Sequence, residues 1–589
     1  MIVPMTKYSF VLLSSGKEEF LGKLQELGLL DVTRSSKPID EYSTGLLDKA
    51  GELRRHIADI EKDNFNRDPE YVRLCESLAA EKKDYASRLP WGEFDRKAID
   101  GLAEKGLRMH FYSVPEKKFD PAWAELQPLE VISREDGTVW FVTVAPEAGY
   151  SFPVAEIEGP AGTAAECFKA MERTREAIKL RKEVLSDEKK DIPALKEEYA
   201  GLLNELDLHL AKASGESAAE QMLTLIQAFA PTENDAAVKE ALDGMDGVYY
   251  MAEPATKEDN PPIKLRNNWF ARQFETLTGM YGMPLYDEWD PTPVLAPFFL
   301  LFFALCMGDG GYGLLLIAIA YALKGCKGEG PMGLAKHWRL IRFLGIGTFV
   351  VGMFLGTFFG ISLADATWFP ESLKKYLLVG NIGKFPLQMV LALAIGVFHI
   401  CLAMVIKSLL YTKRFGFKEN ISTWGWTLLI VGGLIAFIVA AVAGLPADVT
   451  KWIIIGIAAV SALAIFIFNK PGRNPLLNVG AGLWDTYQMA TGILGDVLSY
   501  IRLYALGLAG GMLGGAFNTL GGMVLGDHPT FQWVFFLIIV VLGHALNLAM
   551  SCLGAFVHPL RLSFVEYFKN SGYEGKGTGF NPFRKTVKE

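Results

Sequence analysis

The sequence predicts an α-helical membrane domain of about eight passes, preceded by an α/β domain that carries a long antiparallel coiled-coil arm. Half of the 589 residues are hydrophobic and 21% are charged, and membrane-length apolar runs begin only after Pro293. The charge divides at the same place. Residues 1–290 contain 36 basic and 54 acidic side chains, a net charge of −18, whereas residues 291–589 contain 22 and 12, a net charge of +10.

This composition excludes several classes of protein. The chain is too apolar to be disordered or collagen-like. Its six scattered cysteines include no C-x-x-C pair, which disfavours a disulfide scaffold, a zinc site and a redox motif. The acidic N-terminal half disfavours nucleic-acid binding. The sequence has no G-x-x-x-x-G-K-[ST] phosphate loop. We therefore expect no catalytic site, metal or cofactor in this chain.

The first expected domain spans residues 1–268 and has two lobes. A strand at 8–13, a helix at 18–28 and a strand at 29–32 form a small α/β lobe, and the helix–strand pattern of 217–252 completes it. Residues 253–268 are typical of a linker.

Two charged segments, 40–86 and 160–213, have apolar residues at helical spacings of three and four. They flank an α/β stretch at 110–156 and have similar lengths, which predicts an antiparallel coiled-coil arm. Pro193 is expected to kink the second helix. The simplest role for such an arm is that of a spacer or docking lever.

A connector at 269–292 leads to the membrane domain, expected at 293–568, and a tail follows at 569–589. The apolar runs lie at 294–323, 340–363, 386–411, 422–444, 450–468, about 478–517 and about 529–560. The last two predict long tilted helices. The first run has the glycine-rich sequence GDGGYG at its middle, so it forms either two short passes or a re-entrant hairpin.

Basic residues follow the first, third, fifth and seventh runs, at 324–342, 413–418, 470–473 and 569–588. The excess of Lys and Arg in cytoplasmic loops places these segments inside. The N-terminus lacks the features of a signal peptide. We therefore expect both termini in the cytoplasm and the chain in the plasma (inner) membrane.

Ionisable residues inside apolar runs are the candidates for function, because a charge at membrane depth is costly. Arg502 lies in the middle of the sixth run, and Arg561 lies near the end of the seventh. At about 100° per residue, Asp485 and Asp496 share one side of a continuous helix, and Arg502 lies about 120° from Asp496.

The last run has a polar stripe. The same spacing aligns His544, Asn547, Ser551, His558 and Arg561, with Glu566 at the edge of the stripe. Such an arrangement suits a path for protons or cations that leads to a fixed cationic barrier. Structural alternatives remain. Arg502 can be paired with Asp496 or with backbone carbonyls, and Arg561 can extend to the interface. The histidines can be packing residues, and Asp309 can cap a turn.

Four segments resemble one family closely. They are PTPVLAPFFLLFFALCMGDGGYGLLL (291–316), SYIRLYALGLA (499–509), GHALNLAMSCLGAFVHPLRLSFVEYF (543–568) and YEGKGTGFNPF (573–583). They are similar to the membrane-embedded a subunit of rotary V-type and A-type ATPases, called subunit I in bacteria and archaea. The two-lobed cytoplasmic domain and eight passes also fit, so the resemblance covers the whole chain.

The resemblance implies a stator for ion flow beside a rotating proteolipid ring whose subunits carry ion-binding carboxylates. It also implies peripheral stalks bound by the cytoplasmic domain, a coupling subunit between central stalk and ring, and an ATP-hydrolysing head on other chains. The family's essential arginine matches Arg502 and its second arginine matches Arg561.

This sequence departs from the family pattern in two places. Gly510 and Gly511 stand where many relatives have His or Gln, and Ser551 stands where eukaryotic relatives have Glu. The candidates for lining the half-channels are Glu566, His558, Asp496, Asp365, Asp485, Ser551, Asn547 and His544.

Two other interpretations remain. One is a self-contained secondary transporter with a cytoplasmic regulatory domain, which predicts internal repeats that the sequence lacks. The other is a membrane scaffold or receptor whose buried arginines are structural, in which replacing Arg502 leaves ion transport intact. The sequence does not choose between H⁺ and Na⁺, and H⁺ is the default expectation.

Overall fold

The computed structural model describes all residues except 36, 104, 136, 147–149, 219–221, 246, 326–330, 469–474, 525–528 and 586–589. The chain forms two compact units. The membrane unit comprises Met1–Ser14, Leu29–Thr33 and Glu216–Pro582, and the arm unit comprises Ser15–Gly28, Arg34–Gly215 and Phe583–Glu589. Five charges in the topology prediction lie outside the described residues: Lys327, Lys470, Arg473, Asp527 and Lys588.

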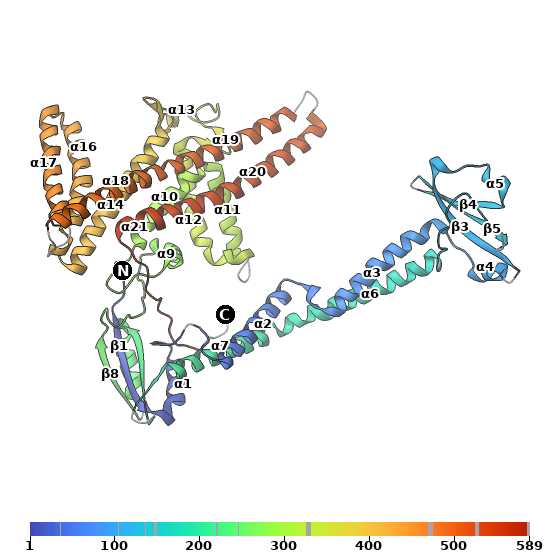
Figure 1. Cartoon of the computed structure of the whole chain (residues 1–589), viewed down its shortest axis with the longest axis horizontal. Coiled ribbons are helices and arrows are strands. Elements are labelled where there is room, and N and C mark those ends of the chain that lie inside the picture. Colours follow the sequence, from blue (N-terminus) through green and yellow to red (C-terminus); the bar gives the residue numbers. More distant parts are fainter. Residues whose placement is uncertain are drawn as a thin grey trace. The chain divides into compact units, whose positions relative to one another are not determined.

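The arm unit is built on two pairs of helices (Figure 1). Helix α2 (Glu41–Glu61) packs against α7 (Ile192–Ser214), and α3 (Pro69–Arg88) packs against α6 (Ala164–Asp187). Both chain segments are interrupted, the second at Glu188–Asp191. Pro193 lies in the first turn of α7, where its missing N–H leaves no hydrogen bond broken. We expected a kink at Pro193 within one helix. The structure instead interrupts the helix just before this residue.

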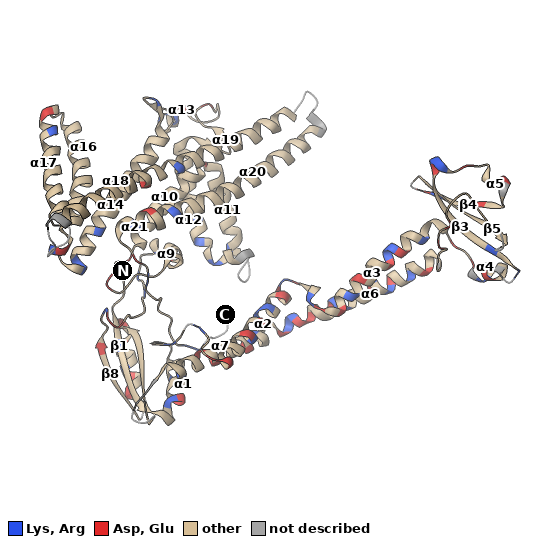
Figure 2. Cartoon of the chain, viewed as in Figure 1, with Lys and Arg blue, Asp and Glu red and all other residues tan. Residues whose placement is uncertain are grey.

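The sequence analysis did not anticipate the matching break between α2 and α3. Asp68 starts α3 as its N-cap, and its carboxylate accepts a hydrogen bond from the Tyr71 backbone N–H at 2.7 Å. The same carboxylate pairs with Arg181 of α6 at 2.7 Å. Figure 2 shows many charged residues along these helices and few on the membrane helices. The arm pairs thus present mainly polar surfaces.

The far end of the arm unit is a small α/β lobe. Strands β3 (Leu107–Pro115), β5 (Thr138–Pro146) and β4 (Leu129–Glu135) pair antiparallel in that order. Helices α4 (Arg96–Ala103) and α5 (Trp123–Leu126) accompany them, and α1 (Lys17–Leu27) packs on α7.

The membrane unit begins with an antiparallel sheet in the order β2-β7-β1-β8, with β6 paired to β7. The strands are β1 (Met5–Leu13), β2 (Asp31–Val32), β6 (Glu216–Ala218), β7 (Leu223–Pro231) and β8 (Val248–Pro254), and α8 (Asp235–Asp243) lies between the last two in sequence. Tyr8, Phe10 and Leu12 of β1 are buried at alternate positions, as strand geometry requires.

The membrane unit continues with a series of helices. They are α9 (Glu275–Tyr281), α10 (Thr292–Met307), α11 (Gly310–Gly325), α12 (Trp338–Leu355), α13 (Glu371–Lys374), α14 (Leu387–Phe415), α15 (Ile421–Thr427), α16 (Gly433–Ala443), α17 (Ala447–Phe466), α18 (Pro475–Ser499), α19 (Ile501–Val524), α20 (Pro529–Arg561) and α21 (Phe568–Ser571). Two short hairpins, β9–β10 (Thr357–Phe358, Ile361–Ser362) and β11–β12 (Asn381–Ile382, Phe385–Pro386), lie between α12 and α14.

Six helical segments among the described residues are long and apolar enough to cross a membrane: 333–355, 387–415, 418–443, 447–466, 478–524 and 532–571. Each matches one apolar run of the sequence. The first run forms α10 and α11, which meet at 120°. The expected turn at the glycines is present, and Gly308 has the positive φ of 61° that favours glycine.

Helix α10 lies at the centre of the membrane unit and packs against α12, α19 and α20. Phe299, Phe302 and Met307 of α10 are fully buried in the core. By contrast, Val442 of α16 and Trp452 of α17 are 84% and 71% exposed. Exposed apolar side chains on such helices are suited to contact with lipid. Figure 1 shows α19 and α20 side by side and oblique to α16 and α17.

Candidate functional site

Arg502 lies directly after a break in the sixth apolar run. Helix α18 ends at Ser499 and α19 begins at Ile501, with Tyr500 between them. The Arg502 guanidinium is close enough to His558 and Cys306 to affect them electrostatically. Its Nη1 is buried and has no hydrogen-bond partner in the part of the chain that the structure describes. Arg502 is thus a half-buried cation, and no ion pair within the described residues joins it to Asp496, the partner that the structural alternative gave it.

The interruption at Tyr500 bears on one step of the sequence analysis. The separation of about 120° between Asp496 and Arg502 assumed one regular helix. At Tyr500 the backbone bonds span three residues, from the Tyr500 N–H to the Val497 carbonyl and from the Leu503 N–H to the Tyr500 carbonyl, while 478–524 stays one apolar helical segment. The interruption therefore changes the angle only locally, and the partners of the two side chains come from tertiary contacts.

One polar cluster joins α11, α19 and α20, and we call it the α11 cluster. Tyr312 Oη lies 2.7 Å from His544 Nδ1 and accepts a hydrogen bond from Asn547 Nδ2 at 2.7 Å. His544 Nε2 lies 2.9 Å from Asn518 Oδ1, and Ser551 Oγ donates to Asn547 Oδ1 at 3.2 Å. Three expected members of the polar stripe therefore form one connected network.

Asp309 holds the loop beside this cluster. Its carboxylate is fully buried and accepts hydrogen bonds from the backbone N–H groups of Gly311 (2.8 Å), Phe359 (2.8 Å) and Gly360 (2.6 Å). The Phe359 carbonyl in turn accepts from Asn518 Nδ2 at 2.7 Å. Asp309 therefore caps a turn, as the structural alternative proposed, and it also fixes a distant hairpin.

A second cluster, the α21 cluster, lies where α18 meets the end of α20. Asn570 Nδ2 donates to Asp496 Oδ2 at 2.7 Å and to the Glu566 carbonyl at 2.6 Å. Lys569 Nζ lies 3.7 Å from Asp496 Oδ2. Glu566 is 2% exposed, and its Oε2 has no hydrogen-bond partner among the described residues. This cluster contains two carboxylates in a largely apolar region.

Arg561 is more exposed than Glu566. Its Nε lies 3.9 Å from Glu566 Oε1, at the limit of an ion pair, and its side chain is 56% exposed. Residues Leu562–Tyr567 form a π-helical stretch, which shifts Glu566 from the edge position that a regular helix gave it and buries it. Such stretches are frequent at functional sites.

The remaining candidates are His558, Asp485 and Asp365. His558 is half-buried near Arg502, and Asp485 is half-buried on α18. Asp365 is exposed in the connection between α12 and α14, and no hydrogen bond or ion pair within the described ranges joins it to either cluster. The structure therefore brings together Asp496 and Glu566 in one cluster and His544, Asn547 and Ser551 in another.

Sequence analysis missed several members of these clusters. Tyr312, Asn518 and Asn570 were missed because the search was directed at ionisable residues. A search for every hydrogen-bonding side chain in the apolar runs would have found them, but it would also have returned many packing residues.

The fold and these clusters define a multi-pass helical membrane protein whose last helices enclose charged and hydrogen-bonding side chains. Residues 209–330 and 488–585 match the model of the V-type ATPase 116kDa subunit family. The chain is 31% identical to the A-type ATP synthase subunit I of Methanocaldococcus jannaschii, over 74% of this chain and 66% of that protein. It is 26% identical to the V-type ATP synthase subunit I 1 of Treponema pallidum, over 99% of this chain and the whole of that protein. Against the A-type ATP synthase subunit I of Pyrococcus abyssi the match is 32% identical and spans 57% of this chain and half of that protein.

The chain belongs to the subunit a/I family of the rotary V-type and A-type ATPases, in its prokaryotic form.

Proposed function

We propose that this chain is the stator subunit that forms two ion half-channels beside a rotating proteolipid ring. In this role it couples ion translocation, with H⁺ as the expected ion, to ATP hydrolysis or synthesis on other subunits. It has no catalytic site of its own.

The observation that carries the proposal is the position of Arg502. Its guanidinium has a buried nitrogen for which the described residues provide no hydrogen-bond partner, and it lies near His558, on the helical segment that connects the two polar clusters. Tyr500, two residues earlier, is at the end of α18, which carries Asp496, and Gly510 of α19 accepts from Asn547 through its carbonyl at 2.8 Å. An arginine does not lose its proton at this depth, so its charge is permanent.

A permanent charge explains both parts of the proposed mechanism. A ring carboxylate that approaches Arg502 is stabilised in its ionised form, so it releases its ion there and takes up another on the far side. The same charge repels a cation that moves directly between the half-channels. Lysine would serve less well because desolvation lowers its pKa readily.

The two clusters are suitable linings for the two half-channels. Asp496, Glu566 and Asp485 line the proposed cytoplasmic side, with Arg561 near its mouth. The α11 cluster and Asp365 belong to the opposite side. A cavity of about 350 Å³, lined in part by Gly308, Thr357, Gln388, Tyr504 and Gly511, adjoins α19 there and offers room for water.

The proposed topology has eight passes, with α10 and α11 as two short ones, and both termini in the cytoplasm. The chain then lies in the plasma (inner) membrane. Residues 1–268 form the cytoplasmic domain, whose paired helices act as a coiled-coil arm that docks peripheral stalks. Residues 269–292 connect it to the translocation domain at 293–568, and 569–589 are the tail. The other partners are the ring, the subunit that couples the central stalk to the ring, and, indirectly, the ATP-hydrolysing head.

The experiment compares ATP-driven ion uptake into vesicles that contain the whole complex with wild-type Arg502, Arg502→Ala and Arg502→Lys. Subunit composition is measured on the same samples. We expect an assembled Arg502→Ala complex to show no uptake and Arg502→Lys to show little. Normal pumping by an assembled Arg502→Ala complex would mean that the arginine is structural and that the proposal is wrong. Replacing Na⁺ with K⁺ in the buffer tests the choice of ion.

A further inference from the structure

His399 is a buried histidine of α14 that the proposed mechanism does not use. Its imidazole is 1% exposed and is stacked between the rings of Phe298 (centroids 4.2 Å apart) and Tyr567 (4.4 Å apart). Its Nδ1 is hydrogen-bonded to Tyr500 Oη at 2.9 Å, and its Nε2 has no hydrogen-bond partner in the described ranges. A phenylalanine would make the same stacking contacts without burying an unpaired nitrogen. The feature that distinguishes histidine here is therefore the bond to Tyr500.

Tyr500 is the residue at which α18 gives way to α19. Its side chain is fully buried, and its ring lies against Gly396, one turn before His399 on α14. A Cβ atom at Gly396 would lie 2.7 Å from Tyr500 Cβ and closer still to its ring, so only glycine fits this position. Gly396, His399 and Phe302, whose ring centroid is 5.6 Å from that of Tyr500, form what we call the Tyr500 socket.

The socket connects the two segments that carry the candidate ion-path residues. Tyr500 precedes Arg502 by two residues, and Tyr567 follows Glu566 directly. His399 touches both tyrosines, one through a hydrogen bond and the other through a stacked ring. A shift of its side chain would therefore move the start of α19 and the π-helical stretch after α20 relative to each other.

We infer that His399 is a positioning residue for ion translocation, which holds the break at Tyr500 and thereby sets the place of Arg502 relative to Glu566. This inference rests on the proposed function, because the positions of those two residues matter only if ions pass between them.

The test uses single variants and a double variant in vesicles that contain the whole complex. His399→Phe keeps the stacked ring and loses the hydrogen bond, and Tyr500→Phe removes the same bond from the other side. His399→Asn retains a polar atom near the position of Nδ1. Phe398→Leu, on the 61%-exposed neighbour of His399, is the matched control. Ions moved per ATP hydrolysed, passive ion leak and assembly are measured for each variant.

We expect His399→Phe and Tyr500→Phe each to lower ion transport per ATP about fivefold, the effect of losing one buried hydrogen bond worth about 1 kcal/mol. The double variant should fall by about the same factor rather than by about 25-fold, because both changes remove one interaction. His399→Asn should recover part of the loss, and the control should pump normally.

Two results would overturn the inference. One is normal transport per ATP in assembled His399→Phe and Tyr500→Phe complexes. The other is losses that multiply in the double variant, since independent effects would not arise from one shared bond. If Arg502→Ala abolishes pumping in the same preparation, either result removes the role of His399 and leaves the proposed function intact. If the single variants fail to assemble, His399→Leu and Tyr500→Leu, which also remove the bond and place no larger side chain in the socket, give the same comparison.

Discussion

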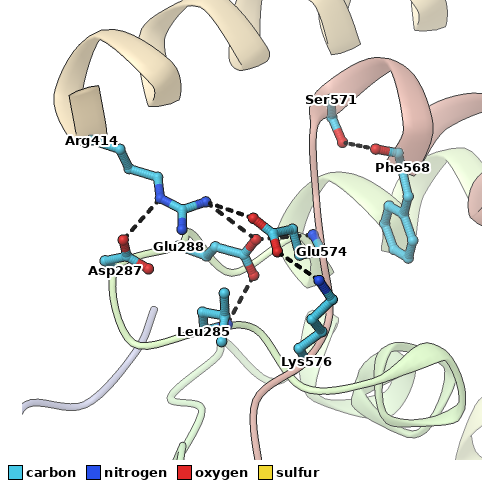
Figure 3. Close-up of polar contacts among 8 residues, drawn as sticks. All are labelled: Leu285, Asp287, Glu288, Arg414, Phe568, Ser571, Glu574 and Lys576. Carbon is cyan, nitrogen blue, oxygen red and sulfur yellow. Dashed lines mark hydrogen bonds and ion pairs between the residues drawn. The ribbon is translucent and has the colours of Figure 1, made fainter. Parts of the chain in front are cut away.

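Arg414 provides a test of how the membrane helices are tied to the segments that leave the membrane. Its Nε donates to Asp287 Oδ2 at 2.8 Å, and its Nη1 lies 3.7 Å from Glu288 Oε1 and 3.4 Å from Glu574 Oε1. Figure 3 shows this one guanidinium, at the end of α14, between a loop that precedes α10 and the tail that follows α21. Arg414→Met removes the cation and leaves three carboxylates together.

The burial of Glu288 and Arg414 determines the free-energy cost expected for Arg414→Met. The Glu288 side chain is only 3% exposed and that of Arg414 12%, so the loss resembles that of a buried pair, which costs about 3–5 kcal/mol. Glu288 keeps hydrogen bonds from the backbone N–H groups of Leu285 (2.8 Å) and Glu574 (2.9 Å), which offset part of the cost. We therefore take the lower end, about 3 kcal/mol, which is a factor of about 100 in an equilibrium constant.

The assay is amide hydrogen exchange of the tail in the assembled complex. The N–H groups of Glu574, Gly577 and Phe580 are bonded to Glu288, Met283 and Ile263 respectively. In Arg414→Met their protection should fall about 100-fold if the tail opens as a unit. The exposed neighbour Lys413 supplies the control Lys413→Met, which should leave exchange unchanged. Adding Glu288→Gln to Arg414→Met should restore part of the protection. Unchanged tail exchange in Arg414→Met would refute the reasoning.

Two further predictions concern the carboxylates of Asp309 and Asp259. Asp309→Asn replaces an acceptor oxygen with a donor that faces either the N–H groups of Gly311 and Phe359 or the N–H group of Gly360. The thermal midpoint of the assembled complex should therefore drop by several degrees, as for a loss of about 2–3 kcal/mol; an unchanged midpoint would contradict the capping role. The pKa of Asp259 is lowered to about 2 from 3.8, first by its hydrogen bond from Lys7 and then by those from Thr256. A carboxyl group whose pKa is lowered in the folded state stabilises the fold at pH values above its ordinary pKa. This stabilisation is lost as the pH falls towards 2. The thermal midpoint of wild type should therefore exceed that of Asp259→Asn at about pH 6, and this difference should shrink as the pH falls to about 2.5. A difference that stays constant over this range would exclude the linkage.

The sequence by itself determined the class of the protein and the positions of its helices. Apolar runs long enough to span a bilayer depend only on local composition, so the run expected at 450–468 appears as α17 and that at 386–411 as α14. The turn in the first run was also predicted from local sequence, because glycine at 308 accepts a left-handed backbone that other residues avoid. The arm helices followed from their 3.6-residue periodicity.

Only the tertiary structure decided how the site is assembled. The interruption at Tyr500 has no proline to indicate it, and it coincides with a socket built from residues about one hundred and about two hundred positions earlier in the chain. Asp496 and Glu566 are linked through Asn570, and Asp309 reaches the hairpin at 359–360. Helical periodicity relates residues within one straight helix, whereas these contacts depend on how separate helices pack. A buried polar group must find its partner wherever packing brings one, and a single sequence does not record that choice.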